Sequence, residues 1–201
     1  MARENLAASL LPEDPPATLS AAWATRCLDR TIGPSAVLFN ELACKRPLLS
    51  LERPGSFFGP SNAGGLGWAL PASLGYKLAA PDKRVIACVG DGSYMFANPV
   101  ACHQVAAAQD IATLTVVFNN RRWEAVRTAT RSVFPDGHAV RANSMPLVPL
   151  DPSPDFERVA KACGAWAEKV SDPFTLPEAL ERALDRVDAG EPALLNLMVD
   201  D

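Results

Sequence analysis

The sequence predicts an α/β fold, namely a doubly wound, mainly parallel sheet with helices on both faces. Two observations predict it. Helical and strand-like segments alternate along the 201 residues, and the strand-like segments are continuous apolar runs, such as 84–89. Continuous apolar runs are typical of parallel strands that helices cover on both faces, because neither side of such a strand meets water.

Apolar spacing predicts each element of the first part of the chain in turn. The expected order is helix 20–32, strand 35–40, a glycine- and proline-rich loop, helix 65–80, strand 84–89, helix 98–109 and strand 113–118. Ser20 begins the first helix as a capping residue, since its hydroxyl can accept a hydrogen bond from the first turn. Pro99 stands in the first turn of a later helix, where its missing N–H costs nothing.

The alternation continues beyond Asn120. The expected order there is helix 123–132, an irregular proline-rich stretch 145–155, helix 156–164, strand 165–170, helix 175–187 and strand 193–199. Residues 1–17 contain several prolines and acidic residues and are typical of an arm or linker. We therefore expect one domain over 18–201.

The composition excludes several classes of partner. The net charge is −4, the pI is about 5.2, and no run of lysine and arginine offers a surface to a nucleic acid. No apolar run approaches about 18 residues, and the N-terminus does not resemble a signal peptide, so we expect a cytoplasmic protein without a membrane span. The five cysteines form no CxxC pair, which fits reduced thiols better than disulfides or a zinc site.

Polar residues follow three of the expected strands. These tips are Asn40-Glu41, Gly90-Asp91-Gly92-Ser93 and Asn119-Asn120. In an open α/β sheet, ligands bind beyond the carboxyl ends of the strands. Glycines that flank a carboxylate allow a close backbone approach, and the following helix adds its positive N-terminal end, so a diphosphate fits there. Carboxylate, amide and carbonyl oxygens form the ligand set that Mg²⁺ prefers.

Each tip alone has a simpler interpretation. An aspartate between glycines often only caps a tight turn, and paired asparagines are common turn formers. The spacing favours a site, because 26 residues, one helix and one strand, separate Gly92 from Asn119. A βαβ unit of this size brings the two tips side by side in one sheet.

The tips also carry a resemblance to a known family. The segments "GDGSYMF" and "VVFNN" match the GDG and NN signature of thiamine diphosphate (ThDP) enzymes, and residues 53–93 closely resemble the corresponding stretch of benzoylformate decarboxylase and acetolactate synthase-like members. The resemblance covers about 20–199 and implies the C-terminal pyrophosphate-binding (PP) domain of this family. It implies ThDP and Mg²⁺ as cofactors.

The resemblance also implies roles for individual residues. Asp91 and Asn120 would bind Mg²⁺ through side-chain oxygens, and Arg122 would bind it through its backbone carbonyl. The residues implied to contact the cofactor are Asn40, Cys44, Gly64, Gly65, Leu66, Gly90, Asp91, Gly92, Ser93, Asn120, Arg122, Trp123 and Val126.

Two residues would serve catalysis. Leu66 matches the bulky apolar residue that forces the two rings of the cofactor into a V, so that the 4′-imino nitrogen can remove the C2 proton. The backbone carbonyl of Gly64 would accept the other 4′ hydrogen. The simpler interpretation of Leu66 is a core residue at a glycine-rich helix start.

The chain departs from the family pattern at two places. Short hydroxyl residues that hold the diphosphate in related decarboxylases are replaced here by Ala43-Cys44-Lys45 after Leu42, so backbone N–H groups or the charge of Lys45 would have to substitute. After the asparagines comes "RRWEAVR", where relatives often show a glycine and a smaller residue. We expect Trp123 and Val126 to shape the substrate side.

A separate domain is missing from this length of chain. The glutamate that activates ThDP lies, in this family, in a pyrimidine-binding (PYR) domain, and Glu41 instead matches a glutamate that PP domains already carry. We therefore expect a second polypeptide to supply the PYR half, with a dimer or heterotetramer as the assembly, or else an excised or degenerate piece. The initial methionine and the arm favour a genuine small subunit.

The resulting hypothesis is the PP subunit of a ThDP- and Mg²⁺-dependent lyase or transferase. It would decarboxylate a 2-oxoacid or condense the product with an acceptor, as an acetolactate-type synthase does. The alternatives are a non-catalytic regulatory or scaffold subunit and a Rossmann-type nucleotide module, although no GxGxxG opens a helix after a strand. We expect His103 to be structural and keep His138 as a candidate for the substrate side.

Overall fold

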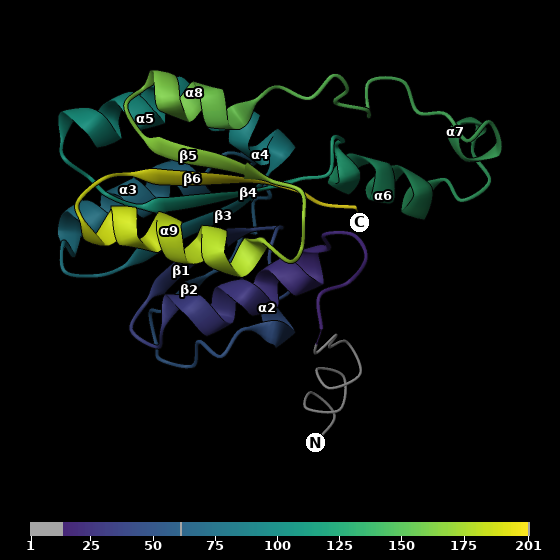
Figure 1. Cartoon of the computed structure of the whole chain (residues 1–201). Helices are drawn as coiled ribbons and strands as arrows, with labels where there is room; N and C mark the ends of the chain where they lie inside the picture. Colours follow the sequence, from purple (N-terminus) through teal and green to yellow (C-terminus); the bar gives the residue numbers. More distant parts are fainter. Residues whose placement is uncertain (1–13, 61, 201) are drawn as a thin grey trace.

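The protein is described by a computed structural model that covers residues 14–60 and 62–200. Within these residues, six parallel strands form one sheet in the order β2-β1-β3-β4-β6-β5 (Figure 1). The strands are β1 (Val37–Glu41), β2 (Phe57–Phe58), β3 (Val85–Gly90), β4 (Leu114–Asn119), β5 (Trp166–Val170) and β6 (Ala193–Met198). The predicted α/β fold with a parallel sheet is confirmed. Most of the predicted arm, residues 1–13, lies outside the described residues.

Helices cover both faces of the sheet. One face carries α2 (Ala21–Ile32) and α9 (Leu176–Asp188), and the other carries α3 (Ala69–Ala79), α5 (Pro99–Ala108) and α8 (Phe156–Ala162). Successive strand residues point to opposite faces. Ile86 and Cys88 of β3 therefore join the core under α2 and α9, whereas Val85 and Val89 join the core on the other face.

The helices α2 and α9 lie side by side (Figure 1). Ser20 caps α2 as predicted, since its hydroxyl accepts a hydrogen bond from the Trp23 N–H at 3.2 Å. The indole N–H of Trp23 donates to the Pro173 carbonyl at 3.0 Å, which ties α2 to the loop before α9.

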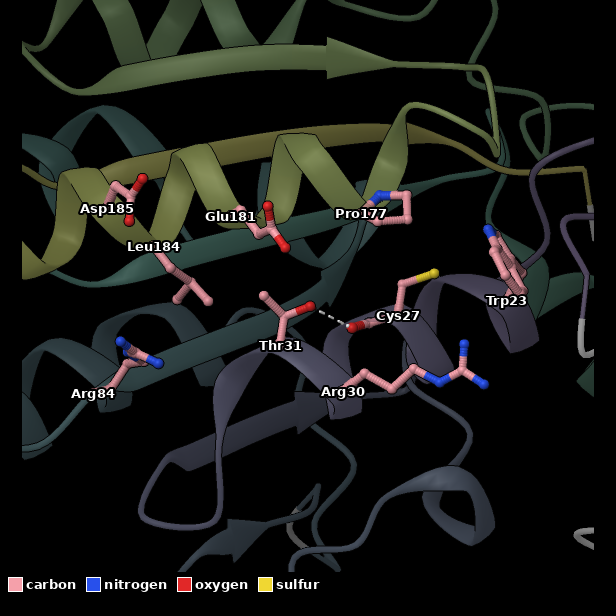
Figure 2. Close-up of a pocket in the computed structure, with 9 residues that line it drawn as sticks. All are labelled: Trp23, Cys27, Arg30, Thr31, Arg84, Pro177, Glu181, Leu184 and Asp185. Atoms are coloured by element: carbon pink, nitrogen blue, oxygen red, sulfur yellow. Dashed lines mark hydrogen bonds between the residues drawn. The ribbon is translucent and has the colours of Figure 1, made fainter.

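A cavity of about 440 Å³ between the two helices reaches Arg84, just before β3 (Figure 2). It thus lies towards the amino ends of the strands, and burial raises the pKa of its Cys27 thiol to about 11.

Several elements differ from the sequence prediction for physical reasons. The edge strand β2 has two residues, too few for a periodic pattern, and it lies in the predicted loop. Helix α3 begins at Ala69 rather than at 65, because Gly67 has φ +86°, outside the helical region. Three short elements have no sequence prediction: η1 (Arg46–Leu48), α4 (Asp91–Phe96) and α7 (His138–Arg141). The predicted helix 123–132 is α6 (Glu124–Val133).

The strand order places the carboxyl ends of β1, β3 and β4 next to one another. The chain runs from β1 outwards to β2 and then returns to β3 on the other side of β1. Loops that leave β1 and β3 therefore diverge to opposite faces, which opens a crevice between the tips.

Among the described residues, no helix is both long and apolar enough to span a bilayer. All five cysteines are free thiols.

One polar pair is embedded in the core beneath α5. The Tyr94 hydroxyl lies 2.7 Å from Nε2 of His103, and the Tyr94 ring packs edge-on against Phe156. Burial lowers the pKa of His103 to about 4 and raises that of Tyr94. His103 is therefore neutral and pairs with a buried hydroxyl, which is a structural role.

The buried Tyr94–His103 pair predicts that acid lowers the stability of the fold. Between about pH 6.5 and pH 4 the unfolded chain binds a proton at His103 and the folded chain does not, so acid favours unfolding. We expect the free energy of unfolding to fall by up to about 3 kcal/mol across this window from His103 alone. Urea denaturation at a series of pH values measures it. His103→Gln should flatten this part of the profile and His138→Gln, the matched control, should not; equal profiles would contradict the assignment.

Candidate functional site

A cavity of about 720 Å³ opens where the tips of β1, β3 and β4 meet. Nine of the thirteen residues predicted to contact the cofactor line it. They are Leu66, Gly90, Asp91, Gly92, Ser93, Asn120, Arg122, Trp123 and Val126. The tip-to-tip arrangement expected from the βαβ spacing is present.

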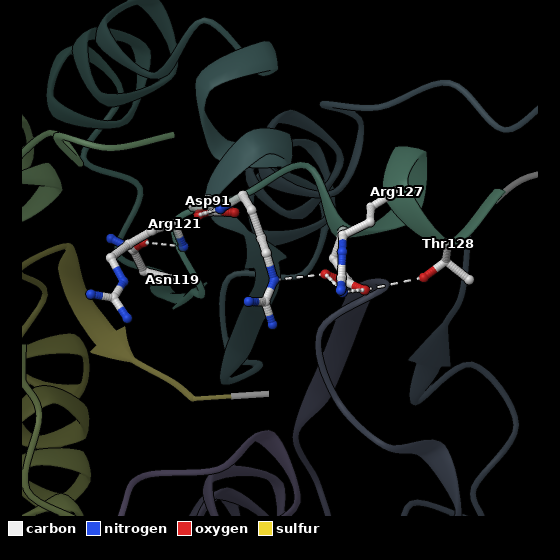
Figure 3. A network of polar contacts seen from close by, with 7 residues as sticks. Asp91, Asn119, Arg121, Arg127 and Thr128 are labelled. Carbon is white, nitrogen blue, oxygen red and sulfur yellow. Dashed lines mark hydrogen bonds and ion pairs between the residues drawn. The ribbon is translucent and has the colours of Figure 1, made fainter. Parts of the chain in front are cut away.

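Asp91 connects two of the tips. It is the first residue of α4, directly after β3, and only 3% of its surface is exposed. One carboxylate oxygen accepts the Gly92 N–H at 2.8 Å. The other accepts the Arg122 N–H beyond β4 at 3.2 Å, one of the contacts in the network around Asp91 in Figure 3. Burial raises the pKa of Asp91, and the backbone N–H groups offset this only in part. A carboxylate in such a position is stabilised by a cation.

The two asparagines after β4 have different roles. Asn119 is fully buried; its amide donates to Ser153 and Asn196, and its oxygen accepts the Arg121 N–H. It therefore fixes the end of the strand. Asn120 lines the cavity. Its predicted contact with a metal ion stays a prediction.

The side chain of Arg122 pairs with Glu124. Its Nε donates to the Glu124 carboxylate at 2.6 Å, and Glu124 also accepts hydrogen bonds from Arg127 and Thr128 at 3.2 Å. Partial burial works to raise the pKa of Glu124, but the two arginines and the Thr128 hydroxyl lower it overall. The guanidinium of Arg122 is thus engaged by a carboxylate.

Glu41 holds the loop that carries Leu66. Glu41 ends β1 and is buried, and its two carboxylate oxygens accept the N–H groups of Gly67 and Ala69. It thereby caps the start of α3, where a negative charge is favourable. Sequence reasoning missed this role, although the Asn-Glu pair at the tip of β1 was a signal for a functional carboxylate.

Four predicted residues do not line the cavity. Asn40 accepts the N–H groups of Ala43 and Cys44 at 3.2 and 2.7 Å and donates to the Cys44 carbonyl, so it closes the turn after β1. Gly64 and Gly65 lie exposed in the turn that leads to Leu66. Lys45, weighed as a substitute for the absent hydroxyls, does line the cavity.

Trp123 covers part of the glycine cradle. A Cβ atom on Gly92 would lie 2.3 Å from the Trp123 ring, so the indole is packed directly against this glycine. The ring also meets Phe96 edge-on, with 6.1 Å between centroids. A ligand that contacts Gly92 from this side must displace the indole, and one that contacts Asp91 and Ser93 need not.

Comparison with known families agrees with this geometry. A family described as thiamine pyrophosphate enzyme, C-terminal TPP binding domain, matches residues 43–197. The chain belongs to this family. The resemblance drawn from the GDG and NN segments is confirmed, and the Rossmann-type alternative is set aside.

The TPP-binding domain has relatives among much longer proteins. It is 31% identical over 151 residues to a sulfoacetaldehyde acetyltransferase of Alcaligenes xylosoxydans xylosoxydans. The aligned region covers 75% of this chain and 23% of that protein. It is 27% identical over 151 residues to a probable acetolactate synthase large subunit of Methanococcus aeolicus, covering 74% and 23%. The chain thus spans less than a quarter of these relatives.

A solved structure shows the same fold. The thiamine diphosphate-dependent 4-hydroxybenzoylformate decarboxylase of Rhodococcus jostii RHA1 superposes with a TM-score of 0.80 and 24% identity. The match covers 94% of this chain and 34% of that chain.

The residues at the tips fit a metal-bound diphosphate. The side-chain oxygen donors among the lining residues include the Asp91 carboxylate and the Asn120 amide, which are hard ligands, whereas the Arg122 carbonyl accepts the Glu124 N–H at 2.9 Å. The Ser93 hydroxyl and the glycine backbone provide hydrogen-bonding groups on the same wall. The cavity volume lies in the range of small-molecule sites, about 300 to 1,000 Å³.

The Leu66 loop predicts a glycine requirement that can be measured. Gly67 has φ +86°, and a Cβ there would lie 2.7 Å from backbone atoms of Phe96 and Ala97. We expect Gly67→Ala to lower the free energy of unfolding by about 2 to 4 kcal/mol in urea denaturation. Gly65→Ala is the matched control, since nothing lies within 4 Å of its Cβ position. Equal stability of the two variants would refute this account of the loop.

Proposed function

We propose that this domain is the PP half of a ThDP- and Mg²⁺-dependent enzyme that acts on 2-oxoacids, either decarboxylating them or transferring the resulting acyl unit. The observation that carries the proposal is that Asp91, Asn120 and Arg122 line one cavity, with the Arg122 N–H bonded to the Asp91 carboxylate. The relatives named as acetyltransferase, acetolactate synthase and benzoylformate-type decarboxylase support this range of reactions.

In this proposal each residue has a defined task. Asp91, Asn120 and the Arg122 carbonyl hold Mg²⁺, which neutralises both the buried carboxylate and a diphosphate. Leu66 supports the cofactor from below, on a loop that Glu41 fixes. The Gly64 carbonyl would accept a hydrogen from the 4′ nitrogen. When bound, thiamine diphosphate supplies an electron sink for the carbon from which carbon dioxide leaves.

The activating carboxylate is proposed to come from outside the described residues. Three carboxylates line the cavity, and each is already engaged by this chain. Glu41 caps α3, Asp91 joins two strand tips, and Glu124 pairs with arginines. None is free to hydrogen-bond a pyrimidine ring, so we propose that a PYR domain supplies the acid.

The surface around the cavity supports such a partner. Leu42 and Val126 line the cavity and expose 62% and 50% of their surfaces, and neighbouring Phe96 exposes 67%. Exposed apolar side chains gathered at one site are typical of an interaction surface. We propose a dimer or heterotetramer in which PYR domains cover this face.

Replacing Asp91 tests the metal site directly. We expect Asp91→Ala to weaken Mg²⁺-dependent ThDP binding at least about 100-fold in calorimetric titrations, because a charged ligand is lost. Asp91→Asn should weaken it similarly while keeping an acceptor oxygen for one of the two N–H groups of Gly92 and Arg122. Asp82→Ala, an exposed control, should bind as the wild type does. Unchanged affinity in folded Asp91 variants would overturn the proposal.

Trp123 offers a test of where the ligand lies. Its indole lines the cavity, so ThDP with Mg²⁺ should quench its fluorescence when the charged rings come close. We expect Trp123→Phe to lose most of the quenching on titration, whereas Trp166→Phe, remote on β5, should retain it. Full quenching in Trp123→Phe would place the ligand elsewhere.

A further inference from the structure

A lobe formed by residues 121–150 stands away from the sheet and carries α6 and α7 (Figure 1). Its two ends are joined at the base by backbone hydrogen bonds. The Trp123 N–H donates to the Val148 carbonyl at 2.9 Å, and the Leu150 N–H donates to the Arg121 carbonyl at 2.7 Å. The lobe is thus a closed loop, and it surrounds a second cavity of about 760 Å³.

The lobe cavity is strongly basic. Arg121, Arg122, Arg127 and Arg131 line it, and Asp151 is the carboxylate among its lining residues. Four arginines and one aspartate line the cavity in a chain whose net charge is −4, and Glu124 and Asp200, outside the lining, pair with three of the arginines. The basic lining is therefore a local feature and does not follow from the overall composition.

Helix α6 separates this cavity from the one at the strand tips. Ala125, Val126 and Ala129 line the tip cavity, whereas Arg127 and Arg131 line the lobe cavity. Residues four apart lie on the same helix face, so the two arginines are neighbours one turn apart. Like charges at this spacing destabilise a helix unless an opposite charge lies nearby.

The described residues neutralise these arginines only in part. Glu124 is shared between Arg122 and Arg127, and Arg121 meets Asp200 at 3.4 Å, with 45% and 54% of the two side chains exposed. An ion pair as exposed as that adds little stability. Arg131 makes no ion pair with any residue in the described part of the chain.

We propose that the lobe cavity binds a small multivalent oxyanion, a phosphoryl compound or a polycarboxylate, at a site that adjoins the tip cavity and shares Asn120 and Arg122 with it. Guanidinium groups bind such oxyanions bidentately, and arginines from two segments, the start of the lobe and α6, surround the space. Asn143 and Ser144 add polar groups to the lining. This site goes beyond the proposed function, because Asp91, Ser93 and Leu66 do not line it and Arg127 and Arg131 line this cavity only.

The test uses the full chain with EDTA and without thiamine, so that no metal-bound diphosphate can form at the tips. Inorganic pyrophosphate and citrate are titrated separately by calorimetry. We expect at least one to bind, and Arg131→Gln to weaken that binding at least about tenfold, since a charge-assisted hydrogen bond is lost. Arg127→Gln should act in the same direction. The tighter of the two anions identifies the phosphoryl or the polycarboxylate class.

Arg141→Gln is the matched control. Arg141 lies on α7 of the same lobe and is exposed, but it does not line the cavity, so its replacement should change the affinity less than about twofold. Absence of binding for both anions would overturn the proposal. So would an equal loss in Arg131→Gln and Arg141→Gln, which would indicate non-specific attraction to the lobe.

Discussion

The hydrogen bonds that the Asp91 carboxylate accepts from the N–H groups of Gly92 and Arg122 are the constraint on which the rest of the site depends. They tie the tip of β3 to the segment after β4, so that Asp91, Asn120 and Arg122 line the same cavity. Burying a carboxylate is costly, and neutral N–H groups repay only part of that cost. The parallel register of β3 and β4 thus leaves a buried carboxylate that a divalent cation would stabilise.

The neighbouring tip uses its carboxylate in a different way. Glu41 ends β1, and both of its oxygens are consumed by the N–H groups of Gly67 and Ala69. The same residue type thus has two roles on adjacent strands, and its hydrogen-bond partners decide which. Because Glu41 fixes the turn before α3, it fixes the height of Leu66 above the sheet without touching any ligand. A residue that positions a loop in this way cannot also act as a free acid.

The sequence predicted the sheet and the location of the site well, because both follow from local patterns. Apolar runs identify parallel strands, and the spacing between Gly92 and Asn119 brings two tips together. Side-chain directions beyond a strand are less predictable. Asn40 was expected to face the cofactor, but it turns back to bond the loop at Cys44. The range of α6 was predicted within one residue, yet its pattern does not reveal that no residue of it is buried.

Helix α6 has no buried residue because each of its two sides faces a cavity, one side apolar and the other basic. A helix with an apolar side normally buries that side, but here Ala125, Val126 and Ala129 face the tip cavity, where a cofactor or a partner domain can cover them. The opposite side presents arginines to the lobe cavity, and Glu124 at the start of the helix links both sides through Arg122. Arg122 donates its N–H to Asp91 at one cavity and adds its guanidinium to the lining of the other. A change in the pairing of Glu124 would therefore reach Asp91 through Arg122, whose side chain bonds Glu124 and whose N–H bonds Asp91.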